Sequence, residues 1–503
     1  MPVDLKLDLE VAYAGWLAEE EKRRQAAVVL ARNYYAGEHE VPLTDRQKEF
    51  LGFQDDGHER FALNYCRTVV SALAERLIVS GFAGVGSGDE SFAKVAWEWW
   101  QGNRSDGLQS RVHSRAVRDG EYFVFVDWDE AAGQPTWVLH PRYTDATVEG
   151  TGFGCKAFYP DGDPDRPMEY ASKRWTETAI DERGRRETRQ RMTLYYPERV
   201  EKYVLMTTNS EAGWAPYAEE DGGRWPVPWV DGQGRPLGIP LIHFRNNADL
   251  RTELWDAVPV QDGINKTVLD VLATADATGF RMLIALGFYP TTDGNPPESD
   301  GSNYLEVHPG CWLGSTKSPR DASVSALDAA DLRPMLDLWM GLELALAKVT
   351  DTPTSRFQAT RQVAAEGTLK QQESPLLAKV RDRQVSFGNS WEDVLYASRR
   401  LANAFGQAGL DEEARVECQW EPAETRDEKA FLEGLAIKRD KLGVPLPRIW
   451  AEAGYSQDEI AEMMDSDEYQ ARVGMLQMGM GMDNRAPAGG ENADDQDGTD
   501  QVR

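Results

Sequence analysis

The apolar residues in the N-terminal part of the chain are spaced as in helices. Residues 5–35 and 64–80 have this period, and the glycines that follow them, Gly37 and Gly81, suit the left-handed backbone found at helix ends. We expect a third helix around the run WEWW at 97–100. The charge block EEEKRR within the first stretch is typical of a solvated helix face.

Between Glu121 and Val230 the pattern changes to that of strands. The β-branched and aromatic runs are separated by clusters of Gly, Pro and Asp, which are turn residues. These runs read EYFVFVDW, PTWVLHP, CKAFYP, RMTLYYP and EKYVLM. Their spacing predicts a meandering antiparallel sheet, and together with the preceding helices it indicates an α+β fold.

Two helices with apolar stripes come next, at residues 256–279 and 331–349. Asp331 is the expected N-cap of the second, and Pro334 lies in its first turn. Between the two helices, RMLIALGFYP and NYLEVHPGCWLGS predict two short strands around an exposed loop that is rich in Gly, Pro, Asp and Ser.

A much longer helix is predicted at about residues 364–405. At about 1.5 Å per residue it spans about 60 Å, a length that is unusual in a compact domain and more natural in a large assembly. Pro375 lies inside this helix and removes one backbone donor. We therefore expect a kink near Gln371.

The C-terminal part begins with one strand, ARVECQW, and continues with charged helices at about residues 424–442 and 447–453. A further helix is expected to begin at Ser456, where Glu459 completes a capping box. Residues 471–503 are rich in Met and Gly and then in acids, which predicts a disordered acidic tail.

The charge balance limits what the chain can bind. It has 55 Lys and Arg against 84 Asp and Glu, a formal net charge of −29. Duplex affinity comes largely from neutralising phosphates with Lys and Arg, so a protein whose whole surface grips nucleic acid is excluded. Any DNA contact must be local or loose. The 16 Trp are most simply core residues, although a Trp-rich chain also suits burial against partners.

The cysteines and the N-terminus indicate an intracellular protein. Cys66, Cys155, Cys311 and Cys418 are far apart and are expected to be reduced apolar fillers. The N-terminus is charged and lacks the apolar region of a signal peptide. The apolar stretches are too short, or too interrupted by charges, to span a bilayer. We expect a soluble protein with no membrane contact.

The sequence lacks the common motifs of enzymes, so an enzymatic function has little support. The chain has no Walker A motif, no G-x-S-x-G elbow and no H-E-x-x-H pair, and its six His are scattered. GVGSG at 84–88 follows a predicted helix instead of a strand, so we interpret it as a flexible loop. DWDE at 127–130 leaves a glycosidase as a weak alternative. The helices around GVPLP at 443–447 resemble a helix-turn-helix, but their acidic surroundings disfavour DNA.

The order of the central elements is the most informative feature. It runs from an amphipathic helix through a small β-insertion with PGCWLG to a helix ending ALAKVTDTPTSRF, a short loop, and the long helix EGTLKQQESPLLAKVRDRQVSFGNSWEDVLYASRRLA. This order resembles the portal proteins, or head-to-tail connectors, of tailed double-stranded-DNA bacteriophages. The earlier segments NYYAGEHEVP, NYCRTVVSALAERLIVSGF and RAVRDGEYFVFVDWD are similar to the opening of that family. The resemblance covers most of residues 25–470.

The resemblance implies a portal fold made of named parts. These are an N-terminal arm and wing (1–255), a stem helix (256–279), a clip (280–330), a second stem helix (331–349), a tunnel loop (350–363), a long kinked wing helix with its returning strand (364–421), a helical crown (422–470) and the acidic tail (471–503). The family also implies a ring, usually of twelve subunits, at one capsid vertex, with no enzymatic activity and no cofactor.

Two sets of candidate contact residues follow from these parts. The tunnel loop is polar and locally basic and is expected to touch DNA phosphates without sequence preference; its candidates are Thr354, Ser355, Arg356, Gln358 and Arg361. Alternatively, its arginines pair with acids of neighbouring subunits. The clip candidates for contacts with the packaging ATPase and a head-completion adaptor are Phe288, Tyr289 and Trp312. These aromatics would otherwise pack within the clip or between subunits.

The partners implied by the family are further copies of the chain, loosely passing double-stranded DNA, the terminase large subunit, the major capsid and scaffolding proteins, and a head-completion adaptor. The expected location is the portal vertex of the virion, with host cytoplasm as the site of assembly. Two rival functions remain open at this stage: another capsid-associated minor head protein, and an acidic Trp-rich hydrolase.

Overall fold

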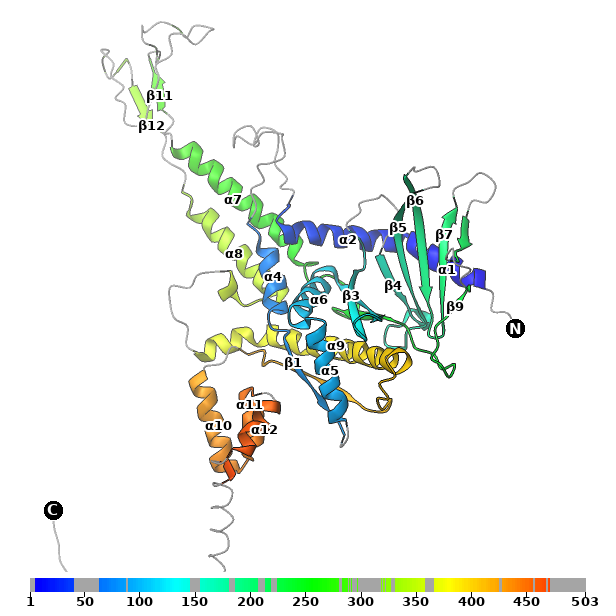
Figure 1. Ribbon diagram of the computed structural model, residues 1–503. Coiled ribbons are helices and arrows are strands. Elements are labelled where there is room, and N and C mark those ends of the chain that lie inside the picture. Colours follow the sequence, from blue (N-terminus) through cyan, green and yellow to red (C-terminus); the bar gives the residue numbers. More distant parts are fainter. Residues whose placement is uncertain are drawn as a thin grey trace, which may run out of the picture. The chain divides into compact units, whose positions relative to one another are not determined.

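The chain divides into two units, Met1–Ala423 and Glu424–Arg503, in a computed structural model. The structure describes residues 5–39, 63–86, 89–144, 154–180, 186–206, 213–218, 224–279, 283–287, 289, 291, 296, 318, 320–321, 323–326, 331–357, 366–424, 428–455, 457–466 and 469–470. Figure 1 shows the helices and strands of the first unit and the three helices of the second. Helices and antiparallel strands coexist in the first unit, which confirms the α+β prediction.

The N-terminal helices differ from the prediction at two places. The single helix expected over 5–35 is two helices, α1 (Leu5–Leu17) and α2 (Glu19–Ala36), because Ala18 between them has an extended backbone. Gly37 caps α2 in the left-handed conformation with φ 88°, as predicted.

The prediction of one helix over residues 64–80 is also wrong in its second half. Helix α4 covers only Tyr65–Ala74, and Val79–Gly84 form strand β1. Strand β1 pairs antiparallel with β13 (Val416–Trp420), a partner that local periodicity cannot reveal. Gly81 therefore lies in a strand, and the GVGSG loop follows a strand and not a helix.

Helices α5 (Glu90–Gly102), which contains the WEWW run, and α6 (Ser105–Asp119) lead into two antiparallel sheets. The three-stranded sheet has the order β10-β2-β3. Its strands are β2 (Glu121–Asp129), β3 (Gln134–Pro141) and β10 (Leu241–Arg245). The six-stranded sheet runs β4-β5-β6-β7-β8, with β9 on β7. Its strands are β4 (Gly154–Phe158), β5 (Tyr170–Ile180), β6 (Arg186–Tyr195), β7 (Arg199–Met206), β8 (Gly213–Pro216) and β9 (Val227–Pro228). The consecutive order β4 to β8 confirms the predicted meander for these strands. The single sheet expected over 121–230 is wrong at its start, because β2 and β3 pair with β10 in a separate sheet.

The three central helices agree with the prediction to within two residues. Helices α7 (Ala257–Gly279) and α8 (Arg333–Thr350) lie side by side, and α9 (Glu366–Phe405) is 40 residues long (Figure 1). Leu332, not Asp331, stands at the cap position of α8, although the Arg333 N–H still donates to Asp331 Oδ1 at 3.0 Å.

Between α7 and α8, strands β11 (Leu283–Leu286) and β12 (Ser323–Ala326) form a two-stranded sheet. The first of the two predicted strands, in RMLIALGFYP, is confirmed. The second, in NYLEVHPGCWLGS at 303–315, lies outside the described residues. Pro375 is inside α9, while the kink near Gln371 stays a prediction.

The main core of the first unit is built on α9. Trp391 is fully buried and makes edge contacts with Trp100 and Phe244, each at 4.9 Å between ring centroids. Its indole N–H donates to His113 Nε2 at 2.9 Å, while His113 Nδ1 bonds the Leu77 carbonyl at 2.8 Å. One helix face thereby joins α5, α6 and the three-stranded sheet, and through His113 it reaches Leu77, just before β1. Cys66, Cys155 and Cys418 are free and buried, whereas Cys311 lies outside the described residues.

The second unit consists of α10 (Glu428–Leu442), α11 (Leu446–Ala453) and α12 (Gln457–Asp465), with Leu435, Ile449 and Ile460 buried. The helices occupy the predicted positions. Ser456 and the predicted acidic tail at 471–503 lie outside the described residues.

The buried His113 makes stability depend on pH. Burial lowers its pKa to about 4, whereas an unfolded His titrates near 6.5, so the unfolded chain takes up the proton first as pH falls. The free energy of unfolding should fall by up to about 3 kcal/mol between pH 7 and pH 4 through this residue. We expect His113→Gln to reduce that slope in denaturant unfolding.

The control for this experiment is Phe244→Leu, which perturbs the same core without changing a titrating group. It should lower stability equally at both pH values. A slope in His113→Gln equal to that of the wild type would contradict the assignment.

Candidate functional site

The predicted tunnel-loop residues lie in the segment that follows α8. We call residues 351–357 the post-α8 segment; Thr354, Ser355 and Arg356 form a short 3₁₀ turn, η2 (Thr354–Arg356), within it. Gln358 and Arg361 lie outside the described residues. The described part of the site is therefore three of the five predicted residues and the elements that position them.

The start of the post-α8 segment is fixed to α9. Asp351 ends α8 in the left-handed conformation with φ 54°, and the Thr352 N–H donates back to the Ala347 carbonyl at 3.0 Å. Lys379 of α9 donates to the Thr350 carbonyl at 2.9 Å and pairs with Asp351 at 3.2 Å. A cation at the carbonyl end of a helix also complements the helix dipole.

The end of the post-α8 segment is fixed to α4. Arg356 pairs with Glu75 at 3.3 Å, and the two side chains are 38% and 57% exposed. The ring of Phe357 contacts that of Tyr65 edge-on, with 5.5 Å between centroids. An exposed pair of this kind contributes only about 0–1 kcal/mol, so Arg356 is free to exchange its carboxylate for another anion.

The described cations at the post-α8 segment are paired with carboxylates of the same chain. Arg356 faces Glu75, and Lys379 faces both Asp351 and Glu253. The arginine is matched by a carboxylate of its own chain, whereas the alternative interpretation placed that carboxylate on a neighbouring subunit. Sequence reasoning missed Glu75, because it lies 281 positions from Arg356.

Of the predicted clip residues, only Tyr289 is described. Its side chain is 49% exposed and thus accessible to a partner. Phe288 and Trp312 lie outside the described residues.

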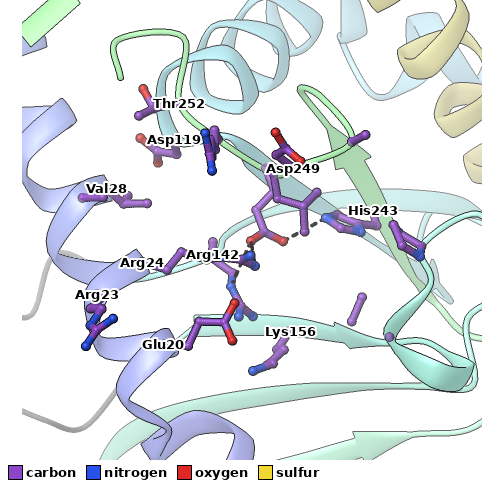
Figure 2. A pocket seen from close by; sticks show the side chains of 18 of the residues that line it. Glu20, Arg23, Arg24, Val28, Asp119, Arg142, Lys156, His243, Asp249 and Thr252 are labelled. Atoms are coloured by element: carbon purple, nitrogen blue, oxygen red, sulfur yellow. Dashed lines mark ion pairs between the residues drawn. The ribbon is translucent and has the colours of Figure 1, made fainter. Parts of the chain in front are cut away.

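A cavity of about 900 Å³ lies beside α2, β4 and the loop after β10 (Figure 2). Arg142 lines this cavity. It pairs with Glu21 of α2 and, at 3.1 Å, with Glu121. Lys156 adds a second cation to Glu21 at 2.8 Å. Figure 2 shows Arg24 and His243 facing the same space.

The charges of this buried cluster are paired with one another and have a structural role. Burial would raise the pKa of Glu121, but Arg142 and His243 outweigh it and lower the pKa to about 2. Burial lowers the pKa of His243, which bonds Glu121 at 2.9 Å and the Tyr159 hydroxyl at 2.8 Å. The carboxylates are thus ionised and matched by cations, which ties α2 to both sheets.

The described residues offer no metal centre: no group of three or more His, Cys, Asp or Glu in these parts of the chain is arranged to hold an ion. Among the described helices, none has the length and apolarity needed to cross a membrane. In GVGSG, the Gly86 N–H donates to Asp89 Oδ2 at 2.9 Å.

Comparison with known families decides between the remaining functions. The family model described as "Phage portal protein, SPP1 Gp6-like" matches residues 15–472. The chain belongs to this phage portal protein family. The resemblance drawn from the order of its helices is thereby confirmed, and the portal function replaces the minor-head-protein and hydrolase alternatives.

Two curated portal proteins are similar over most of their length. The portal protein of Mycobacterium phage D29 is 24% identical over 439 residues, covering 84% of this chain and 82% of the relative. The portal protein of Mycobacterium phage L5 is 23% identical over 435 residues, with the same coverage of 84% and 82%. The portal family is structural and not enzymatic.

A solved structure is also similar, at a low level. A chain of "Neck of empty GTA particle computed with C6 symmetry" aligns with a TM-score of 0.39 and 10% identity, covering 76% of this chain and 91% of that one.

Proposed function

We propose that this portal protein forms a closed ring at one capsid vertex, through which double-stranded DNA is packaged and later ejected. The match to the portal family over residues 15–472 carries this proposal. The partners are the terminase large subunit, the major capsid and scaffolding proteins, and a head-completion adaptor. The ring is assembled in the host cytoplasm and becomes part of the virion.

The order of elements supports an assignment of the portal parts. Helices α7 and α8 are the stem, β11 and β12 belong to the clip, and the post-α8 segment is the described part of the tunnel loop. The sheets and α9 form the wing, and α10 to α12 form the crown. The order of the described elements, a helix, a short two-stranded sheet, a helix, a short segment and a long helix, supports this assignment.

The exposed surface of α8 supports a ring in particular. At about 100° per residue, Leu336, Met340 and Leu344 lie on one flank of the helix, while Leu338 and Val349 lie on the opposite flank. These five side chains are between 38% and 56% exposed. The polar ridge between the flanks consists of Asp337, Gly341 and Lys348. A ring subunit needs two different complementary faces, and two apolar flanks supply them.

In the proposed ring, we assign the ridge of α8 to the channel wall. When both flanks are covered by neighbouring copies and the buried face packs on the same subunit, only the ridge still faces solvent. The ridge carries one acid, Asp337, and one base, Lys348. A wall with balanced charge lets a duplex slide, because it provides no array of cations to neutralise phosphates.

The apolar flanks should be required for assembly. We expect Met340→Lys on one flank and Leu338→Lys on the other each to prevent ring formation, because each places a charge where a neighbour must bury apolar surface. Light scattering after size exclusion and negative-stain imaging measure the outcome. Asp337→Lys introduces the same residue on the ridge and should leave rings intact. Rings formed equally by all three variants would contradict the interface.

The predicted tunnel loop should contact DNA through Arg356 and Arg361. Reversing both charges, Arg356→Glu with Arg361→Glu, is expected to lower DNA retention several-fold in packaging assays while rings still assemble. Glu75→Gln is the matched control, because it removes the intrachain partner but keeps both arginines. If Glu75→Gln reduced retention as much as the double reversal, the intrachain pair and not phosphate contact would be the role of Arg356.

The clip should bind the packaging ATPase and later the adaptor. We expect assembled rings with Trp312→Ala to lose affinity for both partners by at least tenfold, because aromatic anchors dominate interface energies. Tyr289→Ala tests the second aromatic in the same pull-down or interferometry assay. Unchanged binding of both partners by the Trp312 variant would remove the clip assignment for this residue.

A further inference from the structure

Tyr65, the first residue of α4, contacts three elements that are far apart in the sequence. Its N–H donates to Gln261 Oε1 of α7 at 3.0 Å, and its hydroxyl donates to Glu343 Oε1 of α8 at 2.6 Å. Its ring meets Phe357, at the end of the post-α8 segment, edge-on at 5.5 Å. The side chain of Tyr65 therefore bridges α8 and the post-α8 segment, while its backbone N–H holds it to α7.

The bond between Tyr65 and Glu343 is well protected. Glu343 is only 6% exposed, and hydrogen bonds to charged groups strengthen where water is excluded. Burial and the neighbouring Glu343 both raise the pKa of Tyr65, so the hydroxyl stays a proton donor. The carboxylate fixes the direction of the ring, and the ring supports Phe357.

The peptide connection between α8 and Phe357 follows a different path. Lys379 holds Thr350 and Asp351 against α9, so the first turn after α8 is attached to the wing helix. Phe357, by contrast, packs against Tyr65, which is hydrogen-bonded to α7 and α8. A force on the far end of the post-α8 segment is therefore passed to the helix pair by contact, and not only along the backbone.

We propose that Tyr65 is a positioning residue that couples the post-α8 segment to α7 and α8, so that pressure from a molecule in the channel shifts the helix pair. The response to a molecule in the channel rests on the proposed function. The coupling between the post-α8 segment and the two helices is a property of a single chain. Coupling between two places is reciprocal, so a change at either end must appear at the other.

Hydrogen exchange of the full-length protein tests the coupling. The N–H groups of Arg356 and Phe357 donate within the segment at 3.0 Å each and report its order. Tyr65→Phe keeps the ring and removes only the hydroxyl, and we expect exchange of these amides to rise about tenfold. Tyr203→Phe is the matched control, because it removes a tyrosine-to-carboxylate bond of 2.8 Å, to Glu201, in β7.

A second experiment tests the coupling in the opposite direction, from the post-α8 segment to α8. Phe357→Leu is expected to raise exchange in the α8 peptide that contains Glu343, several-fold above the Tyr203→Phe protein. Glu343→Gln, which keeps an acceptor for the hydroxyl but removes the charge, should raise exchange at Phe357 by less than Tyr65→Phe does. Exchange in Tyr65→Phe equal to that in Tyr203→Phe, or no change in α8 with Phe357→Leu, would overturn the coupling.

A packaging assay tests the response to a molecule in the channel. Rings with Tyr65→Phe should retain several-fold less DNA than rings with Tyr203→Phe. Equal retention together with altered exchange would overturn the role in DNA passage and leave the intrachain coupling in place. Failure of the wild-type chain to form rings or retain DNA would instead contradict the proposed function, and the exchange result would still decide the coupling.

Discussion

The first unit depends on one apolar helix face, that of α9. Trp391 on this face touches Trp100 and Phe244 and donates to His113, so it links helices, the two-stranded β1–β13 sheet and the three-stranded sheet in one core. The same helix carries Lys379, which holds the end of α8. Because core packing fixes α9, the position of the post-α8 segment is fixed indirectly by apolar contacts far from it. The long helix thus connects the core with the end of α8 and the post-α8 segment.

The acidic charge of the chain coexists with firmly buried cations. Arg142, fully buried, is matched by Glu21 and Glu121, and removing one partner of such a group typically costs about 3–5 kcal/mol. The net charge of −29 makes neighbouring copies repel one another. In the proposed ring, uncharged contacts such as the two apolar flanks of α8 offset this repulsion. At about 25 cal/mol per Å² of apolar surface, several buried side chains per copy offset screened repulsion.

Long helices, whose apolar residues keep a regular spacing over many turns, could be predicted from the sequence. Contacts between segments far apart in the sequence could not. The stripes of α7, α8 and α9 gave their bounds to within two residues, because a helix is specified by its own spacing. Strand β1 was mistaken for the end of a helix, since its strand identity depends on pairing with β13. At the site, the sequence pointed to Arg356 but not to Glu75 or Tyr65. These partners come from α4, and no spacing rule relates them to the post-α8 segment.

The two attachments of the post-α8 segment to α4 differ in strength, and the difference suits a channel. The pair between Arg356 and Glu75 is exposed, so the guanidinium can turn to a phosphate and back at little cost. The contact between Phe357 and Tyr65 is supported by the buried Glu343 and does not depend on charge. Exchange of anions at Arg356 therefore leaves the backbone position unchanged. In the proposed channel, a segment with an exchangeable ion pair and a fixed backbone would touch passing DNA repeatedly and keep its place.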